Sequence, residues 1–429
     1  QGAIALIVED WQDDIPAHIT QIQVKRSAKA LGIVASNYYD NPSESLRVIA
    51  VTGTNGKTTF ASLMHELAMA VDRKAGLLST VVNKVGKKQI EATHTTPDPL
   101  QTQALLRQMA DEACRFVFME ASSHGIHQER IAGIRLAGAV FTNLSRDHLD
   151  YHGSMEAYIH AKKKLFDDLP SSAFALTNID NRHGRTMVLN TKAQIKTYAL
   201  KTPADFNGKI LESDFNGMLL RFNDDEFWSP LLGVFNAYNL LSIYSAGMIL
   251  KLSERQQLLA ALSLLKPVAG RFQYLKGPNG VTGVIDYAHT PDALENVCKT
   301  VHDVLEKGQR LILVIGCGGD RDKGKRPEMA KIAVKYGQRV IFTSDNPRSE
   351  DPDAIINDME AGLEMDDRAR LLRNTDRREA IRTACHLAEA GDVVLVAGKG
   401  HETYQEIKGI KHPFDDLKVL GETFQKLSS

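Results

Sequence analysis

The stretch Ile49-Ala-Val-Thr-Gly-Thr-Asn-Gly-Lys-Thr-Thr59 decides the fold of this chain. An apolar run over Val48–Val51 predicts a strand, and a helical pattern of apolar residues begins at Ala61, directly after the glycines. Glycines let backbone N–H groups converge on a phosphate, and the helix adds its positive N-terminal end. The stretch therefore predicts a nucleoside triphosphate site rather than an ordinary strand–turn–helix.

Two side chains of this loop have the chemistry that a triphosphate requires. Lys57 is expected to reach the β- and γ-phosphates, and the Thr58 hydroxyl is expected to bind Mg²⁺. The spacing differs from the common P-loop, whose first glycine would fall at Val51, because Gly53 and Gly56 are closer together.

The composition bounds the classes of protein to which the chain can belong. Its 429 residues suggest two or three domains, and 52 basic against 53 acidic residues give no field that favours nucleic acid. Four scattered cysteines suit a reducing cytoplasm, where we expect the protein. No apolar stretch approaches the ~20 residues that span a bilayer, so no membrane insertion is expected.

Strands and helices alternate along the chain, which predicts an α/β fold with mostly parallel sheets. The expected strands are Val48–Val51, Phe116–Met119, Ala139–Thr142, Ala173–Thr177, Val281–Ile285, Leu311–Ile315, Val340–Thr343 and Val393–Ala397. We expect several domains: a central P-loop-type ATPase domain over residues 47–267 and a C-terminal Rossmann-like domain over 268–429. The opening residues Gln1–Glu9 read as the entry to a buried strand, so the chain is expected to begin inside a domain.

Two clusters follow predicted strands of the central domain. Glu120 ends the strand from Phe116, where a carboxylate can hold Mg²⁺, although a solvated loop acid is the alternative. His148 lies beyond the next strand and is interpreted as a metal ligand or phosphate contact, or as a merely hydrogen-bonded histidine.

Lys162 falls at the centre of an apolar stripe on a predicted helix from Met155, counting about 100° per residue. Lys163 and Lys164 are expected to point into solvent. A buried lysine is costly unless it is neutralised or paired. One solution is carbamylation, in which the neutral amine adds CO₂ and can coordinate a metal; the other is a snorkelling lysine.

Three polar loops follow strands of the C-terminal domain. Gly316–Arg326 is interpreted as an anion-binding loop and does not match the dinucleotide fingerprint. Asn346 and Arg348 could form a bidentate clamp for a carboxylate, or belong to a proline-rich turn. Glu402 could receive an ammonium group.

Taken in order, these clusters resemble the Mur ligase family of peptidoglycan synthesis. The matching motifs cover the chain from about residue 30 onward: Thr52–Thr59, Thr95–Pro97, Met119–His124, Thr142–Gly153, Ala161-Lys162, Phe235–Asn239, Gly270–Phe272 and Asp286–Glu295. The resemblance favours carbamylation of Lys162 over snorkelling. Asp-Asn-Pro-Arg at residues 345–348 resembles the signature of members that add meso-diaminopimelate, whose distal carboxylate pairs with the arginine.

The resemblance implies three binding sets. The ATP set is Gly53, Thr54, Asn55, Gly56, Lys57, Thr58, Thr59, Asn236, Asn239, Arg271, Asp286, Tyr287 and His289. The set for the UDP-sugar peptide is Thr95, Thr96, Ser122, Gln128 and Arg130. The set for the incoming amino acid is Arg321, Asn346, Arg348, Gly398 and Glu402.

The implied reaction is ATP-driven formation of an amide bond through an acyl phosphate. Lys57, Glu120, His148 and Lys162 would be the catalytic residues, with Thr58, Glu120, His148 and Lys162 (as N6-carboxylysine) holding two Mg²⁺ ions. The implied partners are UDP-N-acetylmuramoyl-dipeptide and meso-diaminopimelate, and the protein is expected to be a monomer. Residues 1–46 would be an incomplete remnant of the domain that binds the UDP moiety.

Two alternatives use the same ATP loop. A folylpolyglutamate synthetase shares the acyl-phosphate chemistry but should lack the Asp-Asn-Pro-Arg clamp. An inactive ATP-binding scaffold has no need for Lys57, Glu120, His148 and Lys162 together.

Overall fold

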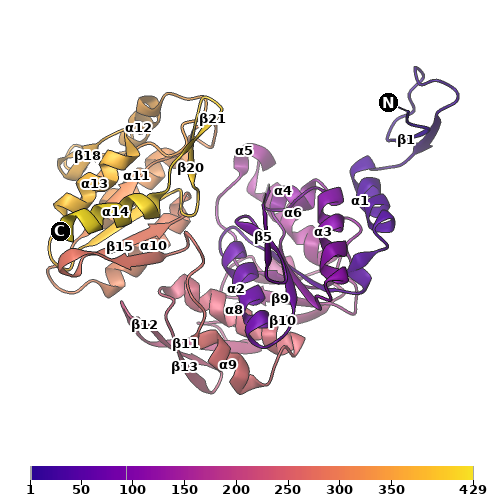
Figure 1. Ribbon diagram of the computed structural model, residues 1–429, viewed down its shortest axis with the longest axis horizontal. Coiled ribbons are helices and arrows are strands. Elements are labelled where there is room, and N and C mark those ends of the chain that lie inside the picture. Colours follow the sequence, from indigo (N-terminus) through magenta and orange to yellow (C-terminus); the bar gives the residue numbers. More distant parts are fainter. Residues whose placement is uncertain (1, 93, 429) are drawn as a thin grey trace. The chain divides into compact units, whose positions relative to one another are not determined.

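The computed structural model describes residues 2–92 and 94–428 of the chain. The chain divides into two compact units (Figure 1). The first contains the chain up to Leu144 together with residues 156–207 and 239–262, and the second contains residues 145–155, 208–238 and the chain from Ser263 onward. The expected boundaries at 46/47 and 267/268 stay a prediction.

A mostly parallel sheet forms the centre of the first unit, in the order β11–β10–β9–β8–β3–β7–β4–β5–β6. Strand β5 pairs antiparallel with both of its neighbours, β4 and β6. The bounds are β3 (Arg47–Thr52), β4 (Ala75–Leu78), β5 (Val82–Val85), β6 (Lys88–Glu91), β7 (Phe116–Glu120), β8 (Leu136–Phe141), β9 (Phe174–Asn178), β10 (Gln194–Ala199) and β11 (Phe206–Asp214). Of β11, only Phe206 and Asn207 belong to the first unit. The side chains of Val48–Val51 are fully buried, as expected of a strand that is covered on both faces.

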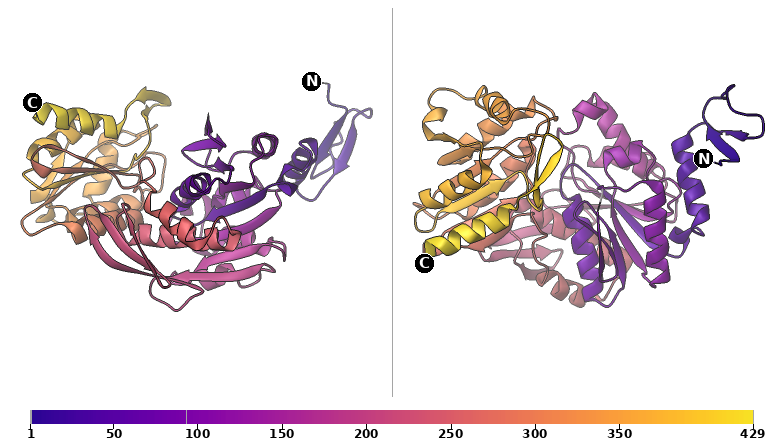
Figure 2. Two further views of the ribbon diagram at one scale, coloured as in Figure 1. Left: turned by 60° about the horizontal axis from the view of Figure 1, so that its bottom comes forward. Right: turned by 45° about the horizontal axis from the view of Figure 1, so that its top comes forward.

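Helices connect and cover these strands. Helix α2 packs against β4 and β7 (Figure 2). The bounds are α1 (Ser27–Tyr38), α2 (Lys57–Ala70), α3 (Pro99–Asp111), α4 (Ser123–His127), α6 (Met155–Asp167), α7 (Gly184–Met187), α8 (Val234–Leu250) and α9 (Arg255–Ser263), with a short 3₁₀ turn over Pro42–Glu44.

The N-terminal strand is present but is not buried, so that part of the prediction was wrong. Strand β1 (Ala5–Val8) pairs in parallel with β2 (Thr20–Gln23) and contacts α1. One partner strand and one helix cover little of its surface, so its side chains are half-buried or exposed.

A second, mostly parallel sheet forms the centre of the second unit, in the order β14–β15–β19–β16–β17–β18. Strand β14 is antiparallel to β15. The bounds are β14 (Gln273–Lys276), β15 (Thr282–Asp286), β16 (Leu311–Ile315), β17 (Arg339–Phe342), β18 (Leu371–Arg373) and β19 (Val393–Ala397). The predicted strands of both units, and with them the α/β fold class, are confirmed.

The remaining elements of the second unit are helices and two antiparallel ribbons. The helices are α5 (Leu149–His152), α10 (Pro291–Val304), α11 (Lys325–Tyr336), α12 (Pro352–Glu360), α13 (Arg377–Leu387) and α14 (Asp416–Ser428), with 3₁₀ turns over Pro278–Gly280 and Asp367–Arg370. The ribbons are β12 (Gly217–Phe222) with β13 (Asp225–Ser229), which continue from β11, and β20 (Tyr404–Ile407) with β21 (Ile410–Pro413).

An ion pair inside the second unit joins α13 to α14, which lie side by side (Figure 1). The side chains of Arg377 and Asp416 are both fully buried, and their closest atoms are 2.7 Å apart. Arg377 also donates to the carbonyl oxygen of Ala397 at 3.0 Å. The pair therefore fixes the end of β19, where the loop with Gly398 begins.

In each unit, the strand register brings the polar loops to one edge of the sheet. In the first unit Val51 pairs with Glu120 and Thr52 pairs with Phe141, so the phosphate loop, Glu120 and Thr142 leave the sheet side by side. In the second unit Ala397 pairs with both Asp286 and Ile315. Ligands of parallel α/β sheets bind beyond this edge.

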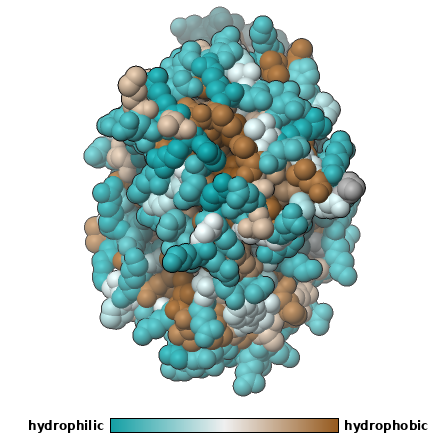
Figure 3. Space-filling view, turned by 90° about the vertical axis from the view of Figure 1, so that its left-hand side faces the viewer, coloured by the Kyte–Doolittle hydropathy of each residue, from teal (hydrophilic) through white to brown (hydrophobic). Residues whose placement is uncertain are grey.

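The last feature of the fold is the hydrophobicity of its helices and of its surface. Among the described residues, no helix is long and apolar enough to cross a membrane. The face of the molecule drawn in Figure 3 is mostly hydrophilic, with separate brown groups of hydrophobic residues.

Candidate active site

The predicted phosphate loop connects β3 to α2, and the helix begins at Lys57, before the first apolar position of the predicted pattern at Ala61. Gly53 and Gly56 have φ of 158° and 85°, which side chains rarely adopt. A Cβ on Gly53 would lie 1.9 Å from Thr142 Oγ1, and one on Gly56 would lie 2.6 Å from Asn239 Oδ1. A residue with a side chain at either position would therefore clash with these neighbours and strain the backbone.

The segment after β8 holds the phosphate loop by hydrogen bonds. Thr142 Oγ1 donates to the carbonyl oxygen of Asn55 at 2.6 Å, and Asn143 Oδ1 accepts from the N–H of Asn55 at 2.9 Å. The N–H of Thr54 donates to the carbonyl oxygen of Asn143 at 2.8 Å. Sequence reasoning gave Asn143 no role, although it lies in a matched motif.

Lys57 bends back over its own loop. Its Nζ donates to the carbonyl oxygens of Gly53 and Thr54, each at 2.9 Å. The ammonium group thus lies at the loop where the β- and γ-phosphates are predicted to bind. Thr58, the next residue, is buried in the first turn of α2.

Glu120 is fully buried at the carboxyl end of β7, so it is not a solvated loop acid. Its Oε2 accepts from Thr58 Oγ1 at 3.0 Å, and its Oε1 accepts from the N–H of Thr80 at 2.8 Å. A buried carboxylate beside a threonine hydroxyl provides the oxygen donors that Mg²⁺ prefers. Thr80 was missed because it follows a different strand, 40 residues earlier.

The residues predicted to bind the UDP-sugar peptide form one hydrogen-bonded network with Glu120. Thr96 Oγ1 donates to the carbonyl oxygen of Glu120 at 2.9 Å and lies 3.1 Å from Ser122 Oγ. Thr80 Oγ1 donates to Thr95 Oγ1 at 3.1 Å.

Arg130 extends this network along the loop after α4. Its Nη1 donates to the carbonyl oxygen of Thr96 at 2.8 Å, and its Nη2 donates to Gln128 Oε1 at 2.7 Å. The structure therefore brings together the residues that were predicted for the sugar peptide.

Lys162 is buried at the centre of the inner face of α6, as the periodicity predicted, and a snorkelling lysine is excluded. Its Nζ donates to the carbonyl oxygen of Gly53 at 2.9 Å and lies 4.7 Å from the centre of the Tyr158 ring. The Tyr158 hydroxyl is 3.1 Å from Thr54 Oγ1. Helix α6 thus presents both side chains to the phosphate loop.

The prediction for Lys163 was wrong. Its side chain is buried, and its Nζ lies 2.5 Å from Asp167 Oδ1, one turn along α6. The aliphatic stem of a lysine can cover apolar surface while the ammonium reaches a partner. Lys164 lies further out, where it pairs with Asp168 at 2.7 Å.

His148 lies in the second unit, at the N-cap of α5. Its φ of 54° is left-handed, which is uncommon for a residue other than glycine. Its Nε2 is 3.4 Å from Asp147 Oδ2, and 42% of its side chain is exposed. The histidine is therefore accessible to a ligand.

The other predicted nucleotide residues surround Tyr287 in the second unit. The Arg271 guanidinium lies 4.5 Å from the centre of the Tyr287 ring, and His289 Nδ1 is 2.8 Å from the carbonyl oxygen of Tyr287. Asp286 Oδ2 accepts from the N–H of Phe272 at 2.7 Å, and burial raises the pKa of this carboxyl to about 6.

The two predicted asparagines of α8 fall in different units. Asn236, in the second, donates through Nδ2 to the carbonyl oxygen of Leu232 at 2.8 Å. Asn239, in the first, adjoins Gly56 as described above.

Asn346 and Glu402, predicted for the amino acid, are brought together by a buried lysine. Asn346 Nδ2 donates to Glu402 Oε2 at 2.8 Å. The fully buried Lys399 donates through Nζ to Asn346 Oδ1 and to Glu402 Oε2, each at 2.9 Å. Lys399 was missed because its glycine-rich surroundings carry no periodic signal of burial.

Arg348 and Arg321 approach one another at the glycines after β16. A Cβ on Gly318 would lie 3.0 Å from Arg348 Nη1 and 3.7 Å from Arg321 Cγ. Gly398 has a φ of 115°, and a Cβ there would lie 2.5 Å from Asp345 Oδ2. The loops after β16, β17 and β19 therefore lie against one another.

A metal centre made only of protein side chains is not found in residues 2–92 and 94–428, where no three His, Cys, Asp or Glu side chains are grouped for an ion. Mg²⁺ is usually held by one or two carboxylates together with substrate phosphates and water, so it does not require such a group.

Comparisons with known proteins agree with this geometry. Residues 51–246 match the model of the Mur ligase middle domain, and residues 270–400 match that of the Mur ligase glutamate ligase domain. The chain is 54% identical to the UDP-N-acetylmuramoyl-L-alanyl-D-glutamate–2,6-diaminopimelate ligase of Bacteroides thetaiotaomicron, over 99% of this chain and 88% of the relative. It is 42% identical to the ligase of the same name from Geobacillus kaustophilus, over 98% of this chain and 86% of that one.

Solved structures give the same result. A UDP-N-acetylmuramoyl-L-alanyl-D-glutamate–2,6-diaminopimelate ligase superposes with a TM-score of 0.70 at 37% identity, covering 100% of this chain and 88% of the other. The folylpolyglutamate synthase of Thermotoga maritima reaches a TM-score of 0.67 at 16% identity, over 86% of this chain and 90% of the other. That second likeness shows a shared fold alone. The chain belongs to the Mur ligase family.

Proposed function

We propose that this chain is an ATP-dependent ligase that adds meso-diaminopimelate to UDP-N-acetylmuramoyl-L-Ala-D-Glu in peptidoglycan precursor synthesis. The names of relatives that are up to 54% identical over nearly the whole chain support this proposal. One structural observation carries it: Glu120 contacts the phosphate loop through Thr58 and the sugar-peptide network through Thr80 and Thr96. The γ-phosphate and the acceptor must meet for phosphoryl transfer, and this residue adjoins both predicted sites.

The proposed reaction has two steps. An oxygen of the D-glutamate side-chain carboxylate attacks the γ-phosphorus, which forms an acyl phosphate and releases ADP. The amine of meso-diaminopimelate then attacks the acyl carbon, and phosphate leaves with the oxygen that the carboxylate supplied. No protein nucleophile is needed, so the protein acts by positioning and electrostatics.

In the first unit, each residue of the site has a proposed task. Lys57 offsets negative charge on the β- and γ-phosphates, starting from its position at the loop carbonyls. Thr58 and Glu120 supply oxygen donors for Mg²⁺, and Lys162 supplies a further ligand as its carbamate. When bound, two Mg²⁺ ions would neutralise charge on the transferring phosphoryl group.

In the second unit, the assignments rest on the family resemblance. His148 is the remaining proposed metal ligand, and Arg271, Tyr287 and His289 are proposed for the nucleotide. Asn346, Arg348 and Glu402, with Arg321 and Gly398, are proposed for the amino acid. Lys399 and Asn346 both bond Oε2 of Glu402, which fixes the position of this carboxylate among the proposed residues.

Isotope transfer tests the chemistry. With ¹⁸O in the D-glutamate side-chain carboxylate, the proposed mechanism moves one ¹⁸O atom into inorganic phosphate in each turnover, and mass spectrometry would detect it. Formation of the tripeptide product without ¹⁸O in phosphate would refute the acyl phosphate. Absence of product with ATP and both substrates would refute the ligase assignment.

A further inference from the structure

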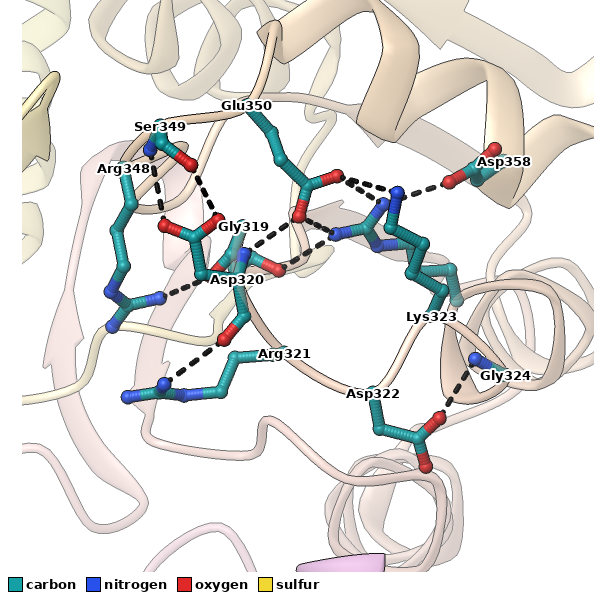
Figure 4. Close-up of polar contacts among 12 residues, drawn as sticks. Gly319, Asp320, Arg321, Asp322, Lys323, Gly324, Arg348, Ser349, Glu350 and Asp358 are labelled. Atoms are coloured by element: carbon teal, nitrogen blue, oxygen red, sulfur yellow. Dashed lines mark hydrogen bonds and ion pairs between the residues drawn. The ribbon is translucent and has the colours of Figure 1, made fainter. Parts of the chain in front are cut away.

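A polar cluster joins the loop after β16 to the loop after β17 (Figure 4). The Asp320 carboxylate accepts from Ser349 Oγ at 2.6 Å and from the Ser349 N–H at 3.2 Å. In return, the Asp320 N–H donates to Glu350 Oε1 at 2.6 Å. The two loops thus hold each other by reciprocal hydrogen bonds across 29 and 30 positions of sequence.

Arg326, at the start of α11, anchors this cluster from inside the unit. Only 1% of its side chain is exposed, and Nη2 and Nη1 donate to the two oxygens of Glu350 at 2.8 and 3.0 Å. These bonds lower the pKa of the Glu350 carboxyl to about 2. Nη2 also donates to the carbonyl oxygen of Gly318 at 3.2 Å. The positive charge of Arg326 is therefore paired with the Glu350 carboxylate inside the protein and does not serve to bind an anion from solution.

Two residues of this cluster are the chain neighbours of the two arginines proposed for the amino acid. Arg321 follows Asp320, and Arg348 precedes Ser349. Arg348 has a φ of 52°, and its Nη1 donates to the carbonyl oxygen of Gly319 at 2.8 Å. A left-handed conformation at a residue with a long side chain costs on the order of 1 kcal/mol and persists only where surrounding contacts impose it.

We infer that Asp320, Ser349 and Glu350, anchored by Arg326, form a loop latch that sets the position of Arg348 relative to Arg321 and so selects the distal carboxylate of the incoming amino acid. This inference rests on the proposed function, because it takes meso-diaminopimelate as the substrate. The three latch residues are positioning residues: they act through the two arginines, which pair with the carboxylate. Bidentate recognition requires exact placement of the guanidinium, so a loosened latch weakens binding of that carboxylate.

Asp358 provides a matched control on the same anchor. Its carboxylate accepts from Arg326 Nη1 at 2.7 Å, but it lies on α12, and its side chain is 47% exposed. Glu350 is 16% exposed and also receives the Asp320 N–H. Asp358→Asn therefore removes one negative charge beside Arg326 without opening the contact between the loops.

The experiment compares Ser349→Ala, Ser349→Thr, Glu350→Gln and Asp358→Asn in the full chain, using ADP release with meso-diaminopimelate or L-lysine. Loss of one hydrogen bond of the latch should raise the KM for meso-diaminopimelate about fivefold to tenfold in Ser349→Ala and Glu350→Gln. The KM for ATP, and kcat/KM for L-lysine, which lacks the distal carboxylate, should stay within about twofold, by the same arithmetic. Ser349→Thr keeps the hydroxyl and should restore the KM, and Asp358→Asn should leave it unchanged.

An unchanged KM for meso-diaminopimelate in folded Ser349→Ala and Glu350→Gln proteins would overturn the inference. An equal loss with L-lysine would also overturn it, because the effect would then be general. If Glu350→Gln does not fold, Ser349→Ala decides. Amide hydrogen exchange tests the latch independently of the proposed function. In Ser349→Ala, the backbone amides of residues 318–321 and 346–350 should exchange faster than in the unsubstituted protein, whichever substrate the enzyme uses. If the unsubstituted protein shows no activity with meso-diaminopimelate, unchanged exchange in both loops would refute the latch itself, and faster exchange would retain the latch but not its substrate.

Discussion

The contrast between Glu120→Gln and Glu120→Ala separates the structural role of this carboxylate from its charge. In Glu120→Ala, the N–H of Thr80 and the hydroxyl of Thr58 each lose the hydrogen bond to this carboxylate. A hydrogen bond to a charged group contributes about 1.5–3 kcal/mol, so two such bonds give an expected loss of about 3–6 kcal/mol of unfolding free energy. The cavity left by the truncated side chain adds to this loss.

Glu120→Gln should keep the fold. The amide oxygen can accept from the Thr80 N–H, and the amide nitrogen can donate to Thr58 Oγ1, because a hydroxyl can accept as well as donate. We expect an unfolding free energy within about 1 kcal/mol of the original value. The negative charge is lost, and with it one proposed Mg²⁺ ligand, so turnover should fall by at least about 100-fold.

Two assays decide between these outcomes. Denaturant titration measures the unfolding free energy, and ADP release measured across a Mg²⁺ titration reports the metal requirement. Full activity of Glu120→Gln at the original Mg²⁺ concentration would refute the metal role. A Glu120→Ala protein as stable as the original would refute the account of the buried hydrogen bonds.

Three further predictions concern other parts of the molecule. Lys162→Ala should lower ADP release by at least about 100-fold, whereas Lys163→Ala, one position along α6, should leave it within about threefold; equal rates for both variants would exclude the carbamate. Arg348→Ala should reduce the preference for meso-diaminopimelate over L-lysine by about 10–100-fold in kcat/KM, and an unchanged preference would contradict the clamp. Burial lowers the pKa of His65 to about 4, so between pH 6.5 and 4 the unfolded chain binds a proton that the folded protein does not. Stability should therefore fall as the pH falls through this window, by up to about 3 kcal/mol, and the fall in melting temperature should be smaller in His65→Gln.

The sequence predicted those parts of the fold that depend on local patterns. The β-branched run before Gly53 predicted the strand, and the 100° periodicity of α6 predicted the burial of Lys162. Each pattern lies within one segment, so it can be recognised without knowing which other segment packs against it. The same pattern failed for Lys163, since periodicity records where a Cβ points and not how far a flexible stem can bend back onto apolar surface.

Contacts between segments that are far apart in the sequence could not be predicted from such local patterns. Thr80 and Glu120 meet because β4 and β7 are neighbours in the sheet, and Lys399 reaches Asn346 because β19 and β16 are paired and β17 lies beside β16. The order of strands within a sheet is set by crossover connections and is not written in any one segment. The loop latch between Asp320 and Ser349 escaped sequence reasoning for the same reason.

The most direct test of the proposed activity is ADP release by the full chain with ATP and UDP-N-acetylmuramoyl-L-Ala-D-Glu, comparing meso-diaminopimelate with L-lysine. The account predicts turnover with meso-diaminopimelate and much slower, still measurable turnover with L-lysine, because Arg348 needs a distal carboxylate to pair with. Equal turnover with both amino acids would keep the ligase and contradict the role of Arg348. No turnover with either would contradict the proposed function itself.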